Sequence, residues 1–293
     1  MQLRDIRFLL RPEYANSRAL IIGIDNYKHV SPLSYAVSDA EEVKQVLETE
    51  LGFPPENTIY LTNENATKQV ILKEFIALTD YTTLDERVFV FFAGHGHTRT
   101  GFRGEVGYLV PYDGHMNDHS TLIRWDELTR NADLVRAKHM LFIMDACYGG
   151  LALVRNLQPG SARFLKDMML RYSRQVLTAG KADEVVADSG GPLPNHSVFT
   201  GHLIEGMRGA AETPEGIITA SALMAYVYQK VANDKDSHQT PHYGHFEGDG
   251  DFILRIPTLR ESQEQEHDTD ELIVIPYPEP DELRLSAHEK FKQ

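Results

Sequence analysis

The chain has 293 residues, of which 42% are hydrophobic and 25% charged, an ordinary composition for a globular protein of one large domain or two small ones. Its 29 basic and 43 acidic residues give a net charge of −14, which argues against general binding to nucleic acid or anionic membranes and favours cationic substrates. One cysteine excludes an intramolecular disulfide, and no stretch approaches the roughly 18 apolar residues of a membrane span. Arg4, Arg7 and Arg11 stand where a signal peptide would have its apolar core. We therefore expect a cytoplasmic protein.

The first ninety residues predict strands that alternate with helices. Apolar runs at residues 19–24, 58–61 and 87–92 have the length and continuity of strands that are buried on both faces of a sheet. A capping box at residues 38–41 predicts the start of one helix, and Thr67 predicts the start of another, since apolar residues recur at helical spacing after each.

The same alternation continues to residue 256. We expect helices at residues 125–133, 198–207 and 220–231, and strands at residues 140–144, 175–179 and 251–256. Strands that alternate with helices predict an α/β fold, with a mostly parallel central sheet flanked by helices on both faces as an α/β/α sandwich.

Composition changes near both ends of the chain. Residues 261–268 are polar and acidic, and residues 273–280 alternate apolar residues with prolines, as in a flexible tail that carries one docking segment. We therefore expect an N-terminal extension at 1–17, one α/β domain at 18–257, and an acidic tail at 258–293.

Two of the predicted strands each end in a glycine-rich turn that carries a reactive side chain. The strand at 140–144 leads into Asp145-Ala146-Cys147-Tyr148-Gly149-Gly150. The strand at 87–92 leads into Ala93-Gly94-His95-Gly96-His97, and His95 lies 52 residues before Cys147. A thiol becomes a strong nucleophile when a neighbouring imidazole takes its proton, and the same imidazole can later protonate the leaving amine. Strand ends are also where α/β sheets place ligand chemistry. The pattern predicts a dyad of Cys147 and His95.

The glycines of these turns have a chemical use of their own. They leave room for a substrate backbone to approach without meeting a side chain. The backbone N–H groups of Gly96 and Cys147 are then candidates for an oxyanion hole, which would stabilise the tetrahedral intermediate of acyl transfer.

Each of these features also has a plainer interpretation. A lone cysteine is most often a small buried hydrophobic residue, and a histidine at a strand end can simply bond a carbonyl group. His97, His115 and His119 suggest a metalloenzyme, but the chain lacks a His-Glu-x-x-His run, and we expect no metal. The histidine-rich loop expected at residues 238–245 receives no role.

With both motifs in place, the chain resembles the caspase-like cysteine proteases, and among them the prokaryotic caspase homologues and the metacaspases. The resemblance covers about residues 18–256 and includes Phe92-Ala93-Gly94-His95-Gly96, the cysteine motif and Val198-Phe199-Thr200. Caspases likewise carry their histidine about 50 residues before the cysteine. Caspases that cut after aspartate have glutamine two residues before the cysteine, where this chain has Asp145. The resemblance implies a caspase-type sheet, hydrolysis of peptide bonds, and a preference for arginine or lysine before the cleaved bond.

That preference has a physical basis in a carboxylate pocket. A buried, hydrogen-bonded carboxylate favours a guanidinium group because a bidentate pair satisfies both partners. We expect Asp145 to be the first such carboxylate and Asp183 the second, since metacaspase-like proteins carry an acidic pocket residue in the region that resembles Gly180 to Asp183. Glu184 replaces Asp183 if the register shifts by one residue. The plainer alternative for Asp145 is that it caps the turn after its strand.

No cofactor is expected. Asp113, Asp118 and Asp126 are candidates for calcium, which some metacaspases bind, but their spacing lacks an EF-hand pattern. We interpret these three residues as solvated surface charge.

The sequence thus predicts a cysteine endopeptidase that cleaves protein or peptide substrates after arginine or lysine. The alternative is a catalytically silent caspase fold that serves as a scaffold for a partner. Residues 151–174 follow the nucleophile, include an expected turn at 158–160, and predict control by self-cleavage, by an activating protease or by a regulator. The candidate processing sites are Arg155, Arg163, Arg171 and Arg174.

Overall fold

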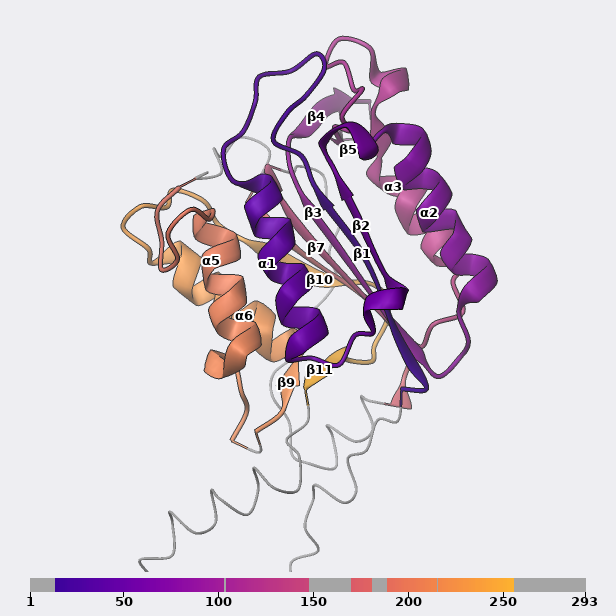
Figure 1. The fold of residues 1–293 in the computed structure, drawn as a ribbon, viewed down its shortest axis with the longest axis vertical. Helices are drawn as coiled ribbons and strands as arrows, with labels where there is room; N and C mark the ends of the chain where they lie inside the picture. The colour runs from indigo at the N-terminus through magenta and orange to yellow at the C-terminus, as the bar shows by residue number, and fades with distance from the viewer. Residues whose placement is uncertain (1–13, 103, 148–169, 181–188, 215, 256–293) are drawn as a thin grey trace, which may run out of the picture. The chain divides into compact units, whose positions relative to one another are not determined.

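A six-stranded sheet forms the centre of the fold (Figure 1). Its spatial order is β10 (His242–Gly248), β8 (Ser173–Gly180), β7 (His139–Cys147), β3 (Glu86–Ala93), β1 (Asn16–Gly23) and β2 (Thr58–Thr62). All neighbours pair in parallel except β10, which pairs antiparallel to β8 at one edge. The computed structural model describes residues 14–102, 104–147, 170–180, 189–214 and 216–255.

Helices cover both faces of this sheet, as the sequence predicts (Figure 1). One face carries α1 (Ala36–Thr49), α5 (Val198–Glu205) and α6 (Ala220–Ala232), and the other carries α2 (Lys68–Tyr81) and α3 (Trp125–Ala132). Buried side chains form a separate hydrophobic cluster on each face. The α/β/α sandwich predicted from the alternation of strands and helices is confirmed.

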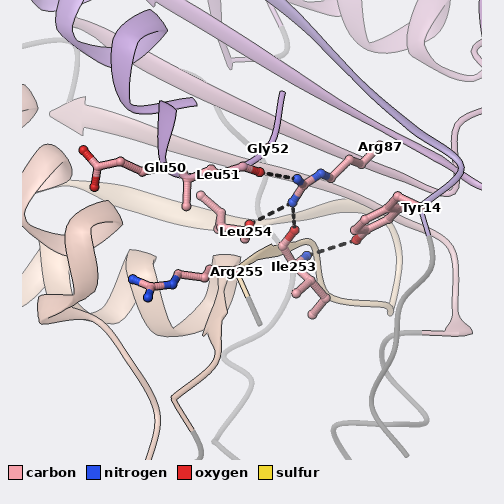
Figure 2. A pocket seen from close by; sticks show the side chains of 8 residues that line it. All are labelled: Tyr14, Glu50, Leu51, Gly52, Arg87, Ile253, Leu254 and Arg255. Atoms are coloured by element: carbon pink, nitrogen blue, oxygen red, sulfur yellow. Dashed lines mark hydrogen bonds between the residues drawn. The ribbon is translucent and has the colours of Figure 1, made fainter. Parts of the chain in front are cut away.

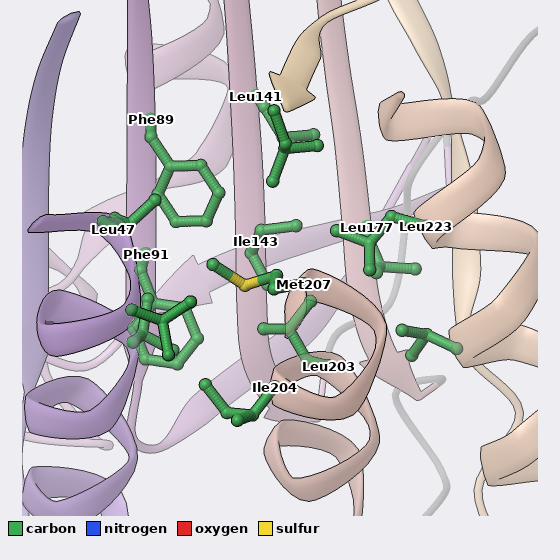
Figure 3. Packing of buried hydrophobic residues seen from close by; sticks show 14 of the residues in the cluster. Leu47, Phe89, Phe91, Leu141, Ile143, Leu177, Leu203, Ile204, Met207 and Leu223 are labelled. Carbon is green, nitrogen blue, oxygen red and sulfur yellow. The ribbon is translucent and has the colours of Figure 1, made fainter. Parts of the chain in front are cut away.

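Strand alternation explains how the central strands serve both clusters. All eight residues of β3 are buried. Phe89 and Phe91 point toward α1 and α5, together with Leu141 and Ile143 of β7, as Figure 3 shows. Their neighbours along β3 pack on the opposite side. A strand that is buried on both faces reads as a continuous apolar run because neither face needs polar residues.

The shorter elements depart from the sequence analysis in two places. A three-stranded sheet of β4 (Gly96–Gly101), β5 (Gly104–Leu109) and β6 (Ile123–Arg124) follows the histidine motif, where no strands were predicted. The expected last strand at 251–256 is instead β11 (Ile253–Arg255), which pairs with β9 (Ile218–Thr219) outside the central sheet. The remaining short helical turns are η2 (Pro55–Asn57), η3 (Asn63–Asn65), η4 (His119–Thr121) and the π-helical η5 (Gly206–Ala210).

Two helix starts test the capping predictions. Thr67 caps α2 as predicted, because its hydroxyl accepts a hydrogen bond from the N–H of Val70 at 3.3 Å. The helix start predicted from the capping box at 38–41 is wrong, since α1 begins at Ala36 and Ser38 lies inside the first turn. Gly23, at the end of β1, permits this early start, because a Cβ atom there would lie 2.5 Å from the carbonyl oxygen of Ala36.

A buried arginine closes the amino end of the sheet. The Arg87 guanidinium donates to the carbonyl oxygens of Leu51, Ile253 and Leu254 at 2.6, 2.5 and 2.9 Å, and to the Ser17 hydroxyl at 2.8 Å. Burial lowers the pKa of Arg87 to about 10. Arg87, Leu51, Ile253 and Leu254 border a cavity of about 280 Å³ (Figure 2), at the opposite end of β3 from the histidine motif. Arg87 therefore ties β3 to the end of α1 and to β11.

Residues before the expected domain start at 18 contact the central sheet. Strand β1 starts at Asn16, and the hydroxyl of Tyr14 accepts a hydrogen bond from the N–H of Ile253 at 3.1 Å. The described residues all lie in the unit Met1–Ile256, and the predicted tail at 258–293 lies outside them. Among the described helices, none combines the length and the apolar character needed to cross a membrane.

Candidate active site

The pairing of β3 with β7 brings the two sequence motifs to the same edge of the sheet. Ala93 pairs with Asp145, and the N–H of Gly94 donates to the carbonyl oxygen of Asp145 at 3.2 Å. His95 follows Ala93 by two residues, as Cys147 follows Asp145. Cys147 is the last residue of β7. Both predicted dyad residues therefore lie at the carboxyl ends of neighbouring parallel strands, where α/β sheets place ligand chemistry.

The ring of His95 is oriented by a backbone carbonyl group. Its Nε2 atom lies 2.9 Å from the carbonyl oxygen of Ser31, in the loop between β1 and α1. A carbonyl oxygen can only accept a hydrogen bond, so Nε2 carries the proton in the neutral ring. The Nδ1 atom is then the basic nitrogen that can take a proton from a thiol.

Tyr27 holds the backbone of His95 from the same loop. The N–H of His95 donates to the Tyr27 hydroxyl at 2.7 Å, and the two ring centres are 5.0 Å apart. Gly94 is required here, because a Cβ atom at that position would lie 2.5 Å from the same hydroxyl oxygen. Burial raises the pKa of Tyr27, so the hydroxyl stays neutral. Sequence analysis did not identify Tyr27.

The loop that carries Tyr27 and Ser31 is itself anchored. The side-chain oxygen of Asn63 accepts hydrogen bonds from the N–H groups of Asp25 and Asn26, both at 3.0 Å. Asn63 has a φ of 44°, a left-handed conformation that asparagine tolerates better than most residues. The position of His95 thus depends on a loop that Asn63, the first residue of η3 after β2, holds in place.

Gly96 presents its N–H group away from β5. The N–H of Val110 donates to the carbonyl oxygen of His95 at 3.0 Å, which makes Gly96 and Leu109 a non-hydrogen-bonded pair of the antiparallel ladder. In such a pair the N–H group of each residue points away from the partner strand. This geometry leaves the predicted oxyanion donor directed away from the small sheet.

Asp145 is buried and bonds the start of α5. Its Oδ2 atom accepts hydrogen bonds from the hydroxyl groups of Ser197 at 2.5 Å and Thr200 at 2.6 Å. Ser197 is also the N-cap of α5, because its hydroxyl accepts from the N–H of Thr200 at 2.9 Å. Asp145 therefore holds α5 against the end of β7, which differs from the local turn cap that the sequence suggested as its plainer role.

A second buried carboxylate, Asp39, lies beside the same helix start. Its Oδ1 atom is 2.8 Å from Nδ1 of His196 and accepts from the N–H of Ser197 at 3.2 Å. Ser197 thus contacts both carboxylates, through its N–H and its hydroxyl. Sequence analysis missed Asp39, although a signal was present: Asp39 shares the buried face of α1 with Ala36 and Ala40.

The remaining candidates of the sequence analysis fall into two groups. Asp183, Arg155 and Arg163 lie outside the described residues. Arg174 is fully buried in β8, and its guanidinium donates to the carbonyl oxygens of Val135 at 2.6 Å and Ala137 at 2.9 Å. This burial argues against Arg174 as a processing site, because a protease cannot reach a bond inside a central strand of the folded protein.

Arg171 is exposed but anchored. Its side chain pairs with Asp249 at 2.5 Å, and its carbonyl oxygen lies 2.7 Å from Nε2 of His139. Burial lowers the pKa of His139 to about 4, so the ring is neutral and Nε2 donates to that carbonyl. The bond after Arg171 is therefore held against β7.

The histidines and aspartates considered for metals have other contacts. Nε2 atoms of His97 and His119 lie 3.2 Å apart, and among the described residues no group of three or more side chains could hold a metal ion. Asp113 accepts from the N–H of Lys68 at 2.9 Å, Asp118 accepts from that of Ser120 at 3.1 Å, and Asp126 pairs with Arg124 at 2.8 Å. The histidine-rich segment forms strand β10 where the sequence analysis expected a loop.

Comparison with known proteins places these features in a family. The model of the Caspase domain family matches residues 16–246. The chain is 26% identical over 156 residues to Metacaspase-1 of Eremothecium gossypii, covering 47% of this chain and 33% of that protein. It is 28% identical over 156 residues to Metacaspase-3 of Arabidopsis thaliana, covering 48% and 41%, and 27% identical over 153 residues to Metacaspase-1A of Aspergillus oryzae, covering 46% and 35%. These matches span well under half the length of each relative.

A solved structure shares the fold. The crystal structure of a protein from Geobacter sulfurreducens aligns with a TM-score of 0.55 at 15% identity, covering 84% of this chain and 96% of that one. Similarity at this level of identity supports the arrangement of the sheet and helices alone.

Proposed function

Because the chain belongs to the caspase-domain family of cysteine peptidases, we propose that it is an endopeptidase in which Cys147 is the nucleophile and His95 its acid–base partner. The observation that carries the proposal is the register of β3 with β7, which ends both motifs at one edge of the sheet. The bond from His95 to Ser31 supports it further, since it leaves Nδ1 as the basic nitrogen.

The proposed reaction uses the groups at this edge one after another. His95 Nδ1 takes the thiol proton of Cys147, and the thiolate attacks the scissile carbonyl carbon. The N–H groups of Gly96 and Cys147 stabilise the resulting oxyanion. His95 then protonates the leaving amine, and a water molecule activated by the same nitrogen hydrolyses the acyl-enzyme.

The proposed specificity is for a basic residue before the cleaved bond. Asp145 and Asp39 are both buried and both contact Ser197, so two carboxylates lie close to the end of β7. Two buried carboxylates can bind one guanidinium through several of its N–H groups, and a lysine ammonium through fewer. Asp183, which follows β8, remains a further proposed acidic residue of this pocket.

The experiment that tests this function uses fluorogenic peptides with arginine, lysine or aspartate before the reporter group. We expect cleavage of the basic peptides, and a loss of at least about a thousandfold in kcat/KM for Cys147→Ala and for His95→Ala. The double variant should be hardly worse than either single variant, because the two residues act as a unit. Circular dichroism verifies that each variant is folded. Unchanged cleavage by Cys147→Ala would contradict the mechanism.

A further inference from the structure

His196 contacts the proposed specificity pocket without belonging to the catalytic motifs. It precedes the N-cap of α5, and its side chain is only 14% exposed. Its Nδ1 atom lies 2.8 Å from Oδ1 of Asp39, the same oxygen that accepts from the N–H of Ser197. The imidazole therefore already occupies one side of a carboxylate that a substrate cation would need.

The charged groups around His196 favour its protonated form. The hydrogen bond that His196 donates to Asp39 is the main cause that raises the pKa of His196 above its ordinary value, and the charges of Asp39 and Glu42 on α1 act in the same direction. Partial burial and Arg208 of η5 oppose them. Arg208 is paired with Glu42 at 2.6 Å and with Glu50 at 3.1 Å, and Asp145 of β7 also contacts this helix start. His196 thus has a raised pKa and lies beside a buried carboxylate.

We propose that His196 sets the specificity of the pocket by competing with the substrate for Asp39. As an imidazolium it neutralises Asp39 and repels a second cation, and as a neutral imidazole it leaves the negative charge of Asp39 to the bound basic side chain. This inference rests on the proposed function, because it needs a pocket that takes a basic residue.

Thermodynamic linkage gives the direction of the effect. If protonation of His196 weakens binding of a cation, then binding of that cation must lower the proton affinity of His196 by the same factor. Below its raised pKa His196 is charged, and the enzyme's preference for arginine over a neutral side chain of the same shape is weak. As pH rises through that pKa the imidazole loses its charge, and discrimination in favour of arginine increases.

The kinetic test compares two peptides that differ only in charge. One carries arginine before the cleaved bond, and the other carries citrulline, which has a neutral side chain of nearly the same shape. Titration of the dyad affects both peptides equally, so it cancels in the ratio of their kcat/KM values. In the wild type we expect this ratio to rise by about fivefold or more between pH 5.5 and about pH 9.

Two variants separate the effect of His196 on this ratio from the effect of another histidine–carboxylate pair. His196→Gln keeps an N–H donor for Asp39 but has no charge, so its ratio should be high and independent of pH. His202→Gln is the matched control, because His202 lies further along α5 and pairs with Asp234 at 2.7 Å, away from the pocket. The control should retain the pH dependence of the wild type. Arginine preference with the same pH dependence in His196→Gln would overturn the inference while leaving the proposed function intact.

A binding measurement tests the inference without turnover. In the Cys147→Ala protein, NMR titration of the His196 imidazole gives its pKa with and without agmatine, a small guanidinium compound. We expect saturating agmatine to lower that pKa and to leave the titration of His202 unchanged. An unchanged His196 pKa in the presence of saturating agmatine would overturn the inference, even if no peptide were cleaved.

Discussion

At the residue scale, Asp145 combines a structural contact with a proposed charge role, and one substitution separates them. Asp145→Asn keeps the size of the side chain and an oxygen that can accept from Thr200, but it removes the charge. A buried charge pair that loses one partner typically loses about 2–5 kcal/mol. We expect kcat/KM for arginine peptides to fall by about thirtyfold or more, and kcat/KM for citrulline peptides to change far less. Parallel kinetics on the two peptides measure this, and equal losses on both would assign Asp145 to structure alone.

Tyr27 allows a similar separation for the catalytic histidine. Tyr27→Phe keeps the ring against His95 but leaves the backbone N–H of His95 without its hydroxyl acceptor, which costs about 1–3 kcal/mol for a buried donor. We expect kcat to fall by about tenfold and KM to stay near the wild-type value, because the base shifts while the pocket does not.

The control for that prediction is Tyr172→Phe. The Tyr172 hydroxyl donates to Glu247 at 3.1 Å, at the amino end of β8 and away from His95. Its kinetics should match those of the wild type. A Tyr27→Phe enzyme with unchanged kcat would show that the hydroxyl is not needed to position His95.

At the element scale, two helix caps offer a matched comparison. Ser197 caps α5 beside the proposed pocket, whereas Thr67 caps α2 on the opposite face of the sheet. Loss of either cap by substitution with alanine should lower the free energy of unfolding by about 1 kcal/mol. Only Ser197→Ala should also raise KM for arginine peptides, because of the two capping hydroxyls only that of Ser197 donates to Asp145. Denaturant unfolding and kinetics on both variants test this, and a similar rise in KM for Thr67→Ala would contradict it.

The central strands could be predicted because the apolar runs in their sequences are sufficient to indicate buried strands. Strand β3 is buried on both faces and reads as an unbroken apolar run, so no knowledge of its neighbours is needed. Strands β4 and β5 are short and mostly glycine, threonine and charged residues, and they form because they pair with each other. Arg174 illustrates the same limit, since its buried guanidinium depends on carbonyl groups 36 to 42 residues away.

The residues of the candidate site also differ in whether a local sequence pattern identifies them. Cys147 and His95 could be found because glycine-rich motifs and their spacing are visible in the sequence. Tyr27 could not, because its partner His95 is 68 residues away, and the place of Asp39 on the buried face of α1 did not reveal its partner Ser197, which is 158 residues away. Local patterns carry no information about such contacts, which exist only once the sheet has assembled.

At the scale of the whole molecule, the two ends of the sheet differ in charge. The carboxyl end carries the buried acids Asp39 and Asp145 beside the N-termini of α1 and α5, whose dipoles stabilise negative charge. The amino end carries the buried cations Arg87 and Arg174, which donate to carbonyl groups and lie over aromatic rings, but it also carries the buried acids Glu86 and Asp251. The excess of buried negative charge at the end where both motifs lie supports the proposed preference for a basic substrate.

The contacts of β8 also restrict where the chain could be cut during activation. The bond after Arg174 lies within a buried strand, and the bond after Arg171 is held by His139 and by the pairing of Arg171 with Asp249. Cleavage after Arg174 would require β8 to leave the sheet, and cleavage after Arg171 would require its contacts with His139 and Asp249 to break. We therefore expect self-processing after Arg155 or Arg163 only, if the enzyme prefers arginine as proposed. Incubation of the wild type beside Cys147→Ala, followed by mass spectrometry of the fragments, tests this. Fragments should appear only in the wild type and end at these two arginines. Fragments that end at Arg174 under native conditions would show that β8 opens, and fragments that end at Arg171 would show that its contacts with His139 and Asp249 do not protect this bond.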